Sequence, residues 1–180
     1  MGHDRSKHIL LIGLRASGKS TLARLLGARL GMDHLDLDAR TPSVAGRATV
    51  AEMIERDGLD AFREAEATAL AQVLDEPAAV ISLGGGSPTA PGAAQRIVDA
   101  EAPIVYLRAQ PETLVERLEA DDNAHRPSLS GKPITEEIVS QFRTRDPLYR
   151  DLAWHVINVD ELELDEVLRE VEESIGERSG

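Results

Sequence analysis

Residues 13–20 read Gly-Leu-Arg-Ala-Ser-Gly-Lys-Ser and match the pattern of glycine, four residues, glycine, lysine and serine or threonine. The stretch follows a short apolar run at residues 8–12, His-Ile-Leu-Leu-Ile, which is typical of a buried parallel strand. It leads into residues 19–30, where leucine and alanine recur at helical spacing before Gly31. A glycine-rich loop between a buried strand and an amphipathic helix predicts a phosphate-binding loop (P-loop) and the start of an α/β fold.

Each residue type in this loop suits a nucleoside triphosphate. Glycines allow a tight turn in which successive backbone N–H groups face one anion, and the following helix adds the positive end of its dipole. Lys19 can reach the β- and γ-phosphates, and Ser20 can offer its hydroxyl to Mg²⁺. The predicted ATP-binding residues of the loop are Gly13, Ala16, Ser17, Gly18, Lys19, Ser20 and Thr21. The loop does not identify the second substrate.

The rest of the chain alternates short apolar runs with helical patterns. Strands are predicted at residues 8–12, 34–37, 79–83, 104–107 and 154–159, and helices at 19–30, 50–56, 59–74, 91–100, 110–120, 135–149 and 164–175. Residues 41–47 contain proline and glycine and predict a turn, and the polar residues 121–133 predict a mobile loop. The alternation indicates a parallel α/β sheet in a single domain over residues 1–180, with a core at about 8–175.

The chain is acidic and contains no cysteine. Its 180 residues include 32 Asp and Glu against 20 Lys and Arg, a formal net charge of -12. This charge argues against nucleic acid and against an anionic membrane surface as partners, because both attract basic faces. Residues 151–180 hold ten of the acidic residues and two of the basic ones, a pattern typical of a solvated face. The lack of cysteine excludes a disulfide framework and a thiolate metal site, and it fits a reducing cytoplasm.

Two further features follow predicted strands, at the edge where open parallel sheets bind their ligands. Asp36 and Asp38 are two residues apart at the end of the second strand, and in an extended segment their side chains point to the same side. Two carboxylates there suit metal–water contacts and acceptance of a hydroxyl proton. Gly84, Gly85 and Gly86 follow the third strand and would let backbone N–H groups approach a ligand closely. These residues mark the predicted acceptor side of the site.

With these motifs in this order, the chain resembles the shikimate kinases from about residue 8 to residue 158. The resemblance rests on GLRASGKST at 13–21, LDLD at 35–38, DGLDAFREAE at 57–66, SLGGGSPT at 82–89, YLRA at 106–109, HRPSLSG at 125–131 and RTRDPLYRDLA at 143–153. It implies a nucleoside-monophosphate-kinase-like fold: a three-layer αβα P-loop kinase with a five-stranded parallel sheet in the order 2-3-1-4-5. It also implies a cytoplasmic, usually monomeric enzyme that transfers the γ-phosphoryl group of ATP to the 3-hydroxyl of shikimate in aromatic amino-acid biosynthesis.

The resemblance assigns roles to residues on the acceptor side. Asp38 would hold the acceptor hydroxyl and take its proton, and Asp36 would lie near Mg²⁺ through a water molecule. Arg63 and Arg145 would bind the shikimate carboxylate, beside the backbone of the three glycines. A planar guanidinium suits a carboxylate because it can bind both oxygens at once.

On the nucleotide side, the resemblance places Arg117 beside the adenine. Arg126 would come from a lid at residues 121–133 that closes over the phosphates and excludes water. Together with Lys19 and Asp38, Arg126 completes the predicted catalytic set.

The chain departs from the family pattern around the acceptor. Residues 39–42 read Ala-Arg-Thr-Pro where the family usually continues as a helix with an Ile-Glu pair, Leu59 stands where Glu is common, and Ile54 stands where an aromatic wall is frequent. These departures leave open a kinase for another hydroxy acid, such as gluconate, and a catalytically silent shikimate-sensing domain. A silent domain should have lost one of the three predicted catalytic residues, and all three are present.

Overall fold

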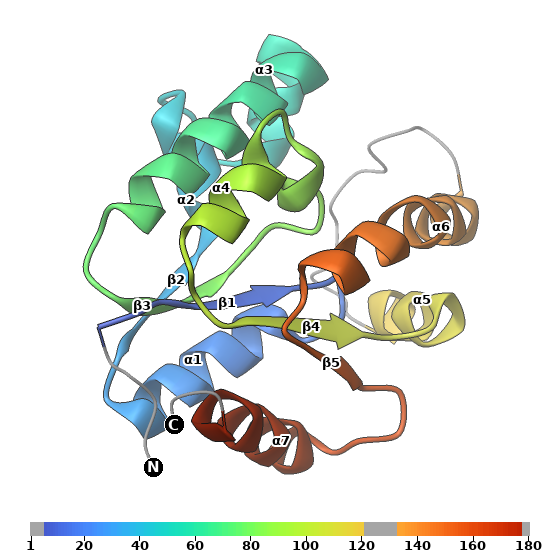
Figure 1. The fold of residues 1–180 in the computed structure, drawn as a ribbon. Coiled ribbons are helices and arrows are strands. Elements are labelled where there is room, and N and C mark those ends of the chain that lie inside the picture. The colour runs from blue at the N-terminus through green and yellow to red at the C-terminus, as the bar shows by residue number, and fades with distance from the viewer. Residues whose placement is uncertain (1–5, 121–132, 178–180) are drawn as a thin grey trace.

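The structure is a computed structural model that describes residues 6–120 and 133–177 (Figure 1). Its strands are β1 (Ile9–Ile12), β2 (Asp33–Asp36), β3 (Ala79–Ser82), β4 (Ile104–Arg108) and β5 (His155–Asn158). Its helices are α1 (Lys19–Leu30), α2 (Leu37–Val44), α3 (Val50–Leu74), the 3-10 helix η1 (Ser87–Thr89), α4 (Ala93–Asp99), α5 (Pro111–Ala120), α6 (Ile134–Leu152) and α7 (Leu164–Glu177).

The five strands form one parallel sheet in the order β2-β3-β1-β4-β5. The central strand β1 pairs with β3 on one side and with β4 on the other, so that Leu10 lies between Ile81 and Ile104. All four residues of β1 are fully buried, which explains why it reads as a continuous apolar run. The predicted strand order is confirmed, and the carboxyl ends of all five strands lie at one edge of the sheet.

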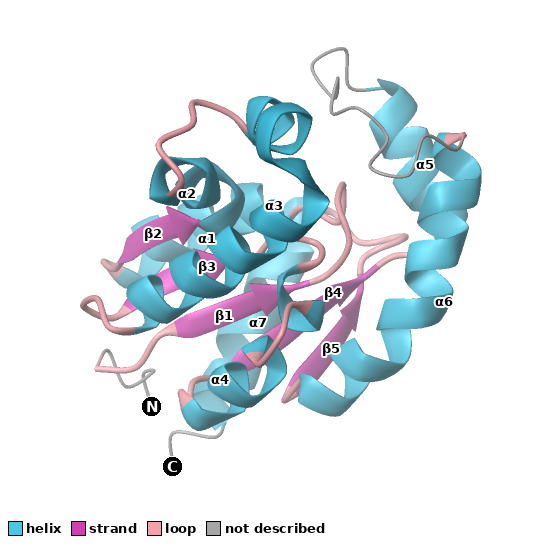
Figure 2. Ribbon diagram, turned by 90° about the horizontal axis from the view of Figure 1, so that it is seen from above, coloured by secondary structure: helices cyan, strands magenta, loops and turns pink. Residues whose placement is uncertain are grey.

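Helices cover both faces of the sheet, as Figures 1 and 2 show. Helices α1 and α7 lie on one face, and α3, α4 and α6 lie on the other. Helix α2 packs on α3, and α5 packs on α6. The predicted three-layer α/β architecture is therefore confirmed.

The segment after β2 differs from the predicted turn, because residues 37–44 form helix α2. Asp36 caps this helix: its side chain accepts a hydrogen bond of 3.0 Å from the backbone N–H of Asp38. Leu37, Thr41 and Pro42 are buried, so packing outweighs the hydrogen bond that proline cannot donate. The turn predicted at 41–47 is therefore wrong for residues 41–44, where Pro42 does not break the capped helix, and right for residues 45–46, which form a turn after it.

Helix α3 confirms the predicted break between residues 56 and 59. Gly58 has φ 86° and ψ 171°, values outside the helical range, so α3 consists of two helical halves that meet at a kink there. A left-handed φ of this kind favours glycine. The bend directs Phe62 and Glu66 of the second half of α3 toward the carboxyl ends of the strands, where both line a pocket.

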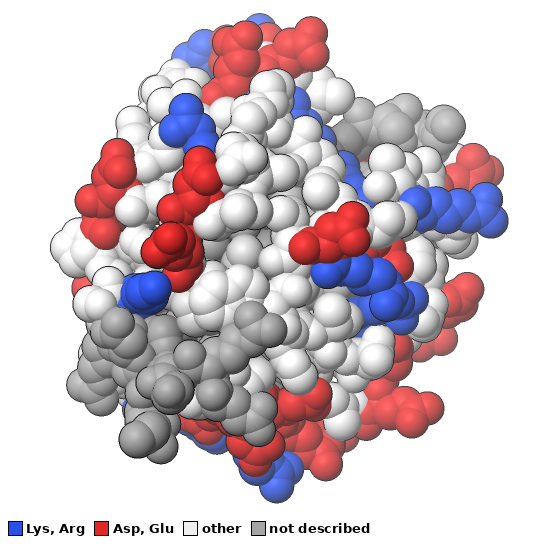
Figure 3. Space-filling model, in the orientation of Figure 1, with Lys and Arg blue, Asp and Glu red and all other residues white. Residues whose placement is uncertain are grey.

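Acidic side chains are spread over the outer surface in Figure 3, and a group of them lies at the bottom of that view, over α7. Arg29 of α1 donates to Asp165 and Glu172 of α7 across 2.9 and 3.4 Å. Such exposed pairs contribute little to stability. Within the described ranges, no helix is both long enough and apolar enough to cross a bilayer.

Candidate active site

The loop between β1 and α1 has the backbone of a phosphate cradle. Gly13 and Gly18 have φ values of 149° and 95°. A Cβ atom on Gly13 would lie 2.6 Å from the carbonyl oxygen of Leu107, so only glycine fits at that position. Ala16 also adopts a left-handed φ, 63°, a strained conformation for a residue with a side chain. The turn carries the chain directly into the N-terminus of α1, where an anion is favoured.

Lys19 lies inside this loop rather than in solvent. It is 7% exposed, and its Nζ donates hydrogen bonds to the carbonyl oxygen of Leu14 at 2.8 Å and to Ser17 Oγ at 3.4 Å. The ammonium group is thus held inside the turn of the loop's backbone. This position suits the predicted contact with the phosphates.

Ser20 points toward the end of β3. Its Oγ lies 3.4 Å from Ser82 Oγ, and Ser82 is the sheet partner of Asp36. Ser20 and Asp36 therefore lie at the same edge of the sheet. Oxygen donors of these two kinds are the ligands that Mg²⁺ prefers, so the residues fit the predicted metal.

A pocket on the α5 and α7 side of the P-loop has walls that suit the planar base of a nucleotide. Its residues come from the P-loop, α1, β4, α5, the segment after β5 and α7: Ala16, Ser17, Gly18, Thr21, Leu22, Leu107, Arg117, Val159, Leu162, Leu164 and Val167. Arg117 donates to the carbonyl oxygens of Val159 at 2.7 Å and of Ala16 at 3.5 Å. The sequence left the role of residues 158–164 undecided, and the structure places three of them in this wall.

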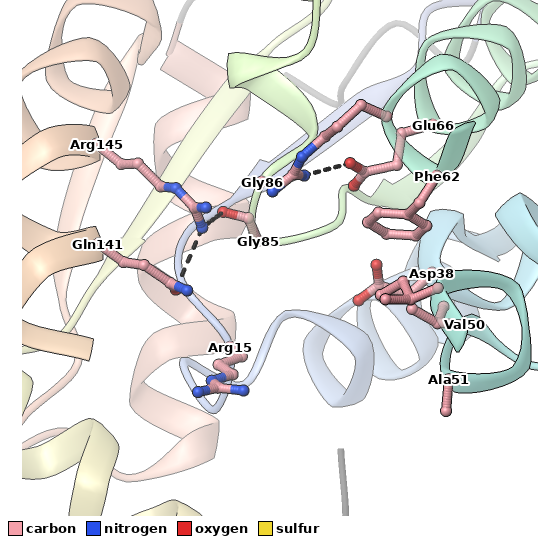
Figure 4. Close-up of a pocket in the computed structure, with 12 residues that line it drawn as sticks. Arg15, Asp38, Val50, Ala51, Phe62, Glu66, Gly85, Gly86, Gln141 and Arg145 are labelled. Atoms are coloured by element: carbon pink, nitrogen blue, oxygen red, sulfur yellow. Dashed lines mark hydrogen bonds and ion pairs between the residues drawn. The ribbon is translucent and has the colours of Figure 1, made fainter. Parts of the chain in front are cut away.

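The acceptor pocket lies at the carboxyl ends of β1, β2 and β3 and is closed on two sides by α3 and α6 (Figure 4). Val50, Ala51, Ile54 and Phe62 of α3 form an apolar wall. The remaining lining residues are polar or glycine: Arg15, Asp38, Arg63, Glu66, Gly85, Gly86, Gln141 and Arg145. A pocket with one apolar wall and several charged groups suits a small ring that carries polar substituents.

Asp38 faces this pocket from the first turn of α2. The prediction that Asp36 and Asp38 point to the same side of an extended strand is wrong, because helix α2 begins between them. Asp36 turns to the backbone of α2 as its cap, whereas Asp38 enters the pocket.

The glycine loop after β3 is shaped by the charged groups around it. A Cβ atom on Gly84 would lie 2.5 Å from Asp38 Oδ1 and 2.7 Å from Ser87 Oγ, and one on Gly86 would overlap the guanidinium of Arg63. Gly84 and Gly86 therefore let the loop approach these side chains closely, and the side chains would have to move to admit a Cβ atom. The result is a loop whose backbone, including Gly85 and Gly86, lines the pocket directly.

Arg63 is held by Glu66, one turn further along α3. Arg63 Nη1 forms an ion pair with Glu66 Oε2, and Ser87 Oγ donates to Glu66 Oε1 at 3.1 Å. Glu66 is 2% exposed, and this burial raises its pKa although Arg63 acts in the opposite direction. The pair fixes the guanidinium against Gly86 at the edge of the pocket.

Arg145 enters the pocket from α6 and has neutral partners. Its Nη1 donates to the carbonyl oxygen of Gly85 at 2.7 Å and to Gln141 Oε1 at 3.3 Å. Within residues 6–120 and 133–177 it forms no ion pair with a carboxylate, and burial lowers its pKa. Tyr149 donates to the same Gly85 oxygen, and burial raises the pKa of Tyr149 to about 12. A half-buried cation with neutral partners is suited to an anionic ligand.

Asp146, the neighbour of Arg145, anchors this part of α6 to the sheet. Its carboxylate accepts hydrogen bonds from Tyr106 at 2.9 Å, Arg108 at 2.8 Å and Arg150 at 2.8 Å. Burial opposes ionisation of Asp146, but these three donors outweigh it and lower the pKa. The rings of Tyr106 and Tyr149 meet edge to face at 5.3 Å. The network holds the helix that presents Arg145.

The structure brings most of the predicted site residues together. Arg63, Arg145 and two of the three glycines line one pocket with Asp38, and Arg117 lies across the P-loop in the other. Arg126 and residues 121–132 of the expected lid lie outside the described residues. Four further residues that line the acceptor pocket are not predicted from the sequence: Arg15, Phe62, Glu66 and Gln141. Helical spacing from Arg63 and Arg145 could have found two of them, since Glu66 and Gln141 lie one turn away.

Comparison with known proteins agrees with this geometry. The model of the shikimate kinase family matches residues 15–176. Shikimate kinase 2 of Yersinia enterocolitica is 36% identical over 151 residues, which cover 83% of this chain and 85% of that protein. The structure of a shikimate kinase from Acinetobacter baumannii in complex with shikimate has a TM-score of 0.86 and 27% identity, and covers 96% of this chain and 94% of the other.

The same fold also occurs in a solved structure that is named as a different kinase. A gluconokinase from Sinorhizobium meliloti has a TM-score of 0.70 and 19% identity, and covers 96% of this chain and 93% of the other. Likeness at this level of identity concerns the fold alone, so it does not bear on the acceptor.

Proposed function

The chain belongs to the shikimate kinase family, and on that basis we propose that it transfers the γ-phosphoryl group of ATP to the 3-hydroxyl of shikimate. The products are shikimate 3-phosphate and ADP, in aromatic amino-acid biosynthesis. One observation carries the proposal: the acceptor pocket combines Asp38 with the half-buried cation Arg145, whose described partners are neutral. A hydroxylated ring acid offers one group to each.

The two ends of the pocket have different tasks. Arg145 and Arg63 would bind the carboxylate of shikimate, and the apolar wall with Phe62 would pack against the ring. Asp38 would accept a hydrogen bond from the 3-hydroxyl and direct it toward the P-loop. Such positioning is the larger part of catalysis in phosphoryl transfer, where the protein forms no covalent bond with the substrate.

The transfer step then follows from these positions. The 3-hydroxyl oxygen attacks the γ-phosphorus while the bond from that phosphorus to the bridging oxygen of ADP breaks. The hydroxyl proton passes to Asp38, and Lys19 stabilises the negative charge of the transferred group. Arg126 would add a second cation from a lid over the phosphates, a role that stays a prediction.

Mg²⁺ would be held by the hydroxyl of Ser20 and, through water, by the carboxylate of Asp36. When bound, it neutralises charge on the phosphates of ATP. We also propose that the chain acts as a monomer of one domain, with residues 121–133 as its lid, as is usual in the family.

A coupled assay of ADP release tests the proposed acceptor. We expect turnover to depend on shikimate and to exceed turnover with gluconate or quinate at the same concentration by at least about tenfold. Gluconate has no ring to pack on the apolar wall, and quinate carries an extra hydroxyl on a tetrahedral carbon where shikimate is planar. Folded protein without shikimate-dependent turnover would refute the proposal. Gluconate as the better acceptor would support a gluconate kinase, and shikimate binding without turnover would support a sensing domain.

A further inference from the structure

Gln141 lies in the acceptor pocket between two charged side chains of the same helix (Figure 4). Its Nε2 donates to Glu137 Oε1 at 2.8 Å, and its Oε1 accepts from Arg145 Nη1 at 3.3 Å. These three residues are spaced by four along α6, so they share one face of the helix. Along this face, Arg145, which would bind the carboxylate of the substrate, is followed by the amide of Gln141 and then by the buried carboxylate of Glu137.

The two neighbours determine which way the amide of Gln141 points. An ionised carboxylate only accepts hydrogen bonds, and a guanidinium only donates them. Nε2 must therefore face Glu137 and Oε1 must face Arg145, because the reversed amide would lose both bonds. The hydrogen bonds to these two neighbours therefore fix which end of the amide is nitrogen and which is oxygen.

Glu137 is itself firmly placed. Its side chain is 4% exposed, and Oε1 also accepts from Arg15 Nη2 of the P-loop at 2.9 Å. Arg145 is bonded at the other end to the carbonyl oxygen of Gly85. The amide of Gln141 is therefore held between the phosphate-binding loop and the glycine loop, which are the two loops that position the substrates.

The amide keeps hydrogen-bonding capacity for a ligand. An amide offers two N–H groups and an oxygen with two lone pairs, and the bonds to Glu137 and Arg145 use one of each. A hydroxyl group can both donate and accept, so it matches what is left. Figure 4 shows Gln141 beside Arg145 on the α6 side of the pocket, with Asp38 on the opposite side.

We propose that Gln141 is a specificity-determining residue that hydrogen-bonds a ring hydroxyl of the acceptor other than the one phosphorylated. Glu137 acts as its positioning residue. The inference rests on the proposed function and deepens it. Asp38 would bind the hydroxyl that is phosphorylated, and Gln141 would recognise one of the other ring hydroxyls. A pocket built to bond a hydroxyl strongly rejects an analogue without it, whereas an apolar wall does not.

The test compares kcat/KM for shikimate, 4-deoxyshikimate and 5-deoxyshikimate in the wild-type enzyme and in Gln141→Leu. We expect the wild type to disfavour one deoxy analogue by about tenfold or more. For Gln141→Leu, kcat/KM for shikimate should fall to about the wild-type value for that analogue. In this variant, kcat/KM for shikimate and for the analogue should differ by less than about threefold. Discrimination against both analogues that is the same in wild type and variant would overturn the proposal.

Three further variants separate this role from a merely structural one. Gln141→Met keeps the length of the side chain and should behave like the leucine variant, so it replaces that variant if the latter does not fold. Glu137→Gln can present either amide atom to Gln141 and should lower discrimination in part. Glu136→Gln removes the same charge from an exposed position of the same helix turn and should leave discrimination unchanged.

Failure of the proposed function has a different signature. Without shikimate turnover in the wild type, the proposed reaction is wrong, and the three acids are then compared by calorimetric binding to wild type and Gln141→Leu. Loss of discrimination in the variant would still support the assigned role of Gln141. Equal discrimination in both proteins would overturn it.

Discussion

Gly86→Ala tests how the glycine loop positions Arg63. An added Cβ atom would lie 3.0 Å from both Cζ and Nη2 of Arg63 and closer still to Nη1, whereas ordinary contact begins near 3.4 Å. Gly86 has φ -115° and ψ -7°, which alanine adopts without strain, so the backbone need not change. The guanidinium must therefore move, by a displacement on the order of 1 Å.

This movement should weaken the proposed carboxylate contact and leave the nucleotide side intact. A displacement of 1 Å at a substrate-positioning group can cost on the order of 100-fold, and loss of a hydrogen bond to a charged group costs about 1.5–3 kcal/mol. We expect kcat/KM for shikimate to fall by about 10- to 100-fold, which corresponds to about 1.4–2.7 kcal/mol. KM for ATP should change by less than about threefold, because Gly86 does not line the nucleotide pocket.

Steady-state kinetics on four proteins check the reasoning: wild type, Gly86→Ala, Arg63→Ala and the double variant. Once Arg63 is alanine, the Cβ atom at position 86 meets no guanidinium, so Gly86→Ala should add little to the loss. Thermal unfolding of all four proteins separates this effect from a loss of fold. Equal losses from Gly86→Ala with and without Arg63 would refute the steric argument, and so would an unchanged kcat/KM for shikimate.

Three other changes give expectations of their own. Asp38→Asn should lower kcat by about 10²- to 10⁴-fold while the Kd for ATP, measured by calorimetry, stays within about threefold; an unchanged kcat would remove Asp38 from the proposed proton transfer. Arg145→Ala should mainly raise KM for shikimate, by about tenfold or more, because the carboxylate contact exists in both ground and transition states; a rise confined to KM for ATP would contradict that assignment. Asp146→Asn should destabilise the fold by about 2 kcal/mol at neutral pH, measured by urea unfolding, because Asp146 accepts three hydrogen bonds. Since the folded-state pKa of Asp146 is lowered, this difference should be constant above the unfolded pKa of about 3.9 and should shrink as the pH falls through the folded pKa; a difference that grows on acidification would show the reverse shift.

Most of the fold was predictable because local and global signals agree along the chain. The apolar run of β1, the glycine turn and the leucine spacing of α1 each indicate the same strand–loop–helix unit, and the structure has it at residues 9–30. Helix α2 was not predictable in this way. Pro42 is a strong local signal for a turn, and the burial of Leu37 and Thr41 that outweighs it exists only once α2 packs on α3.

Some residues of the candidate site were predictable from the sequence and others were not. Lys19 and the three glycines belong to compact motifs, whose spacing alone restricts the chemistry they can serve. Gln141 belongs to no motif, and Glu66 ends a motif in which only Arg63 was given a role; on an isolated helix each would be an ordinary polar residue facing water. They enter the site because α3 and α6 close the pocket from opposite sides, a relation that no local pattern contains.

By itself, the sequence determined the strands and the helices other than α2 along the chain, the phosphate-binding loop, the acidic surface and the family. Only the tertiary structure decided which charges face one another. It separated Asp36 from Asp38 by starting a helix between them, buried Glu66 so that its pKa rises, and left Arg145 among neutral partners. The physical reason is that motifs depend on neighbours in the chain, whereas burial, desolvation and ion pairing depend on neighbours in space, here brought together from residues as far apart as Arg15 and Arg145.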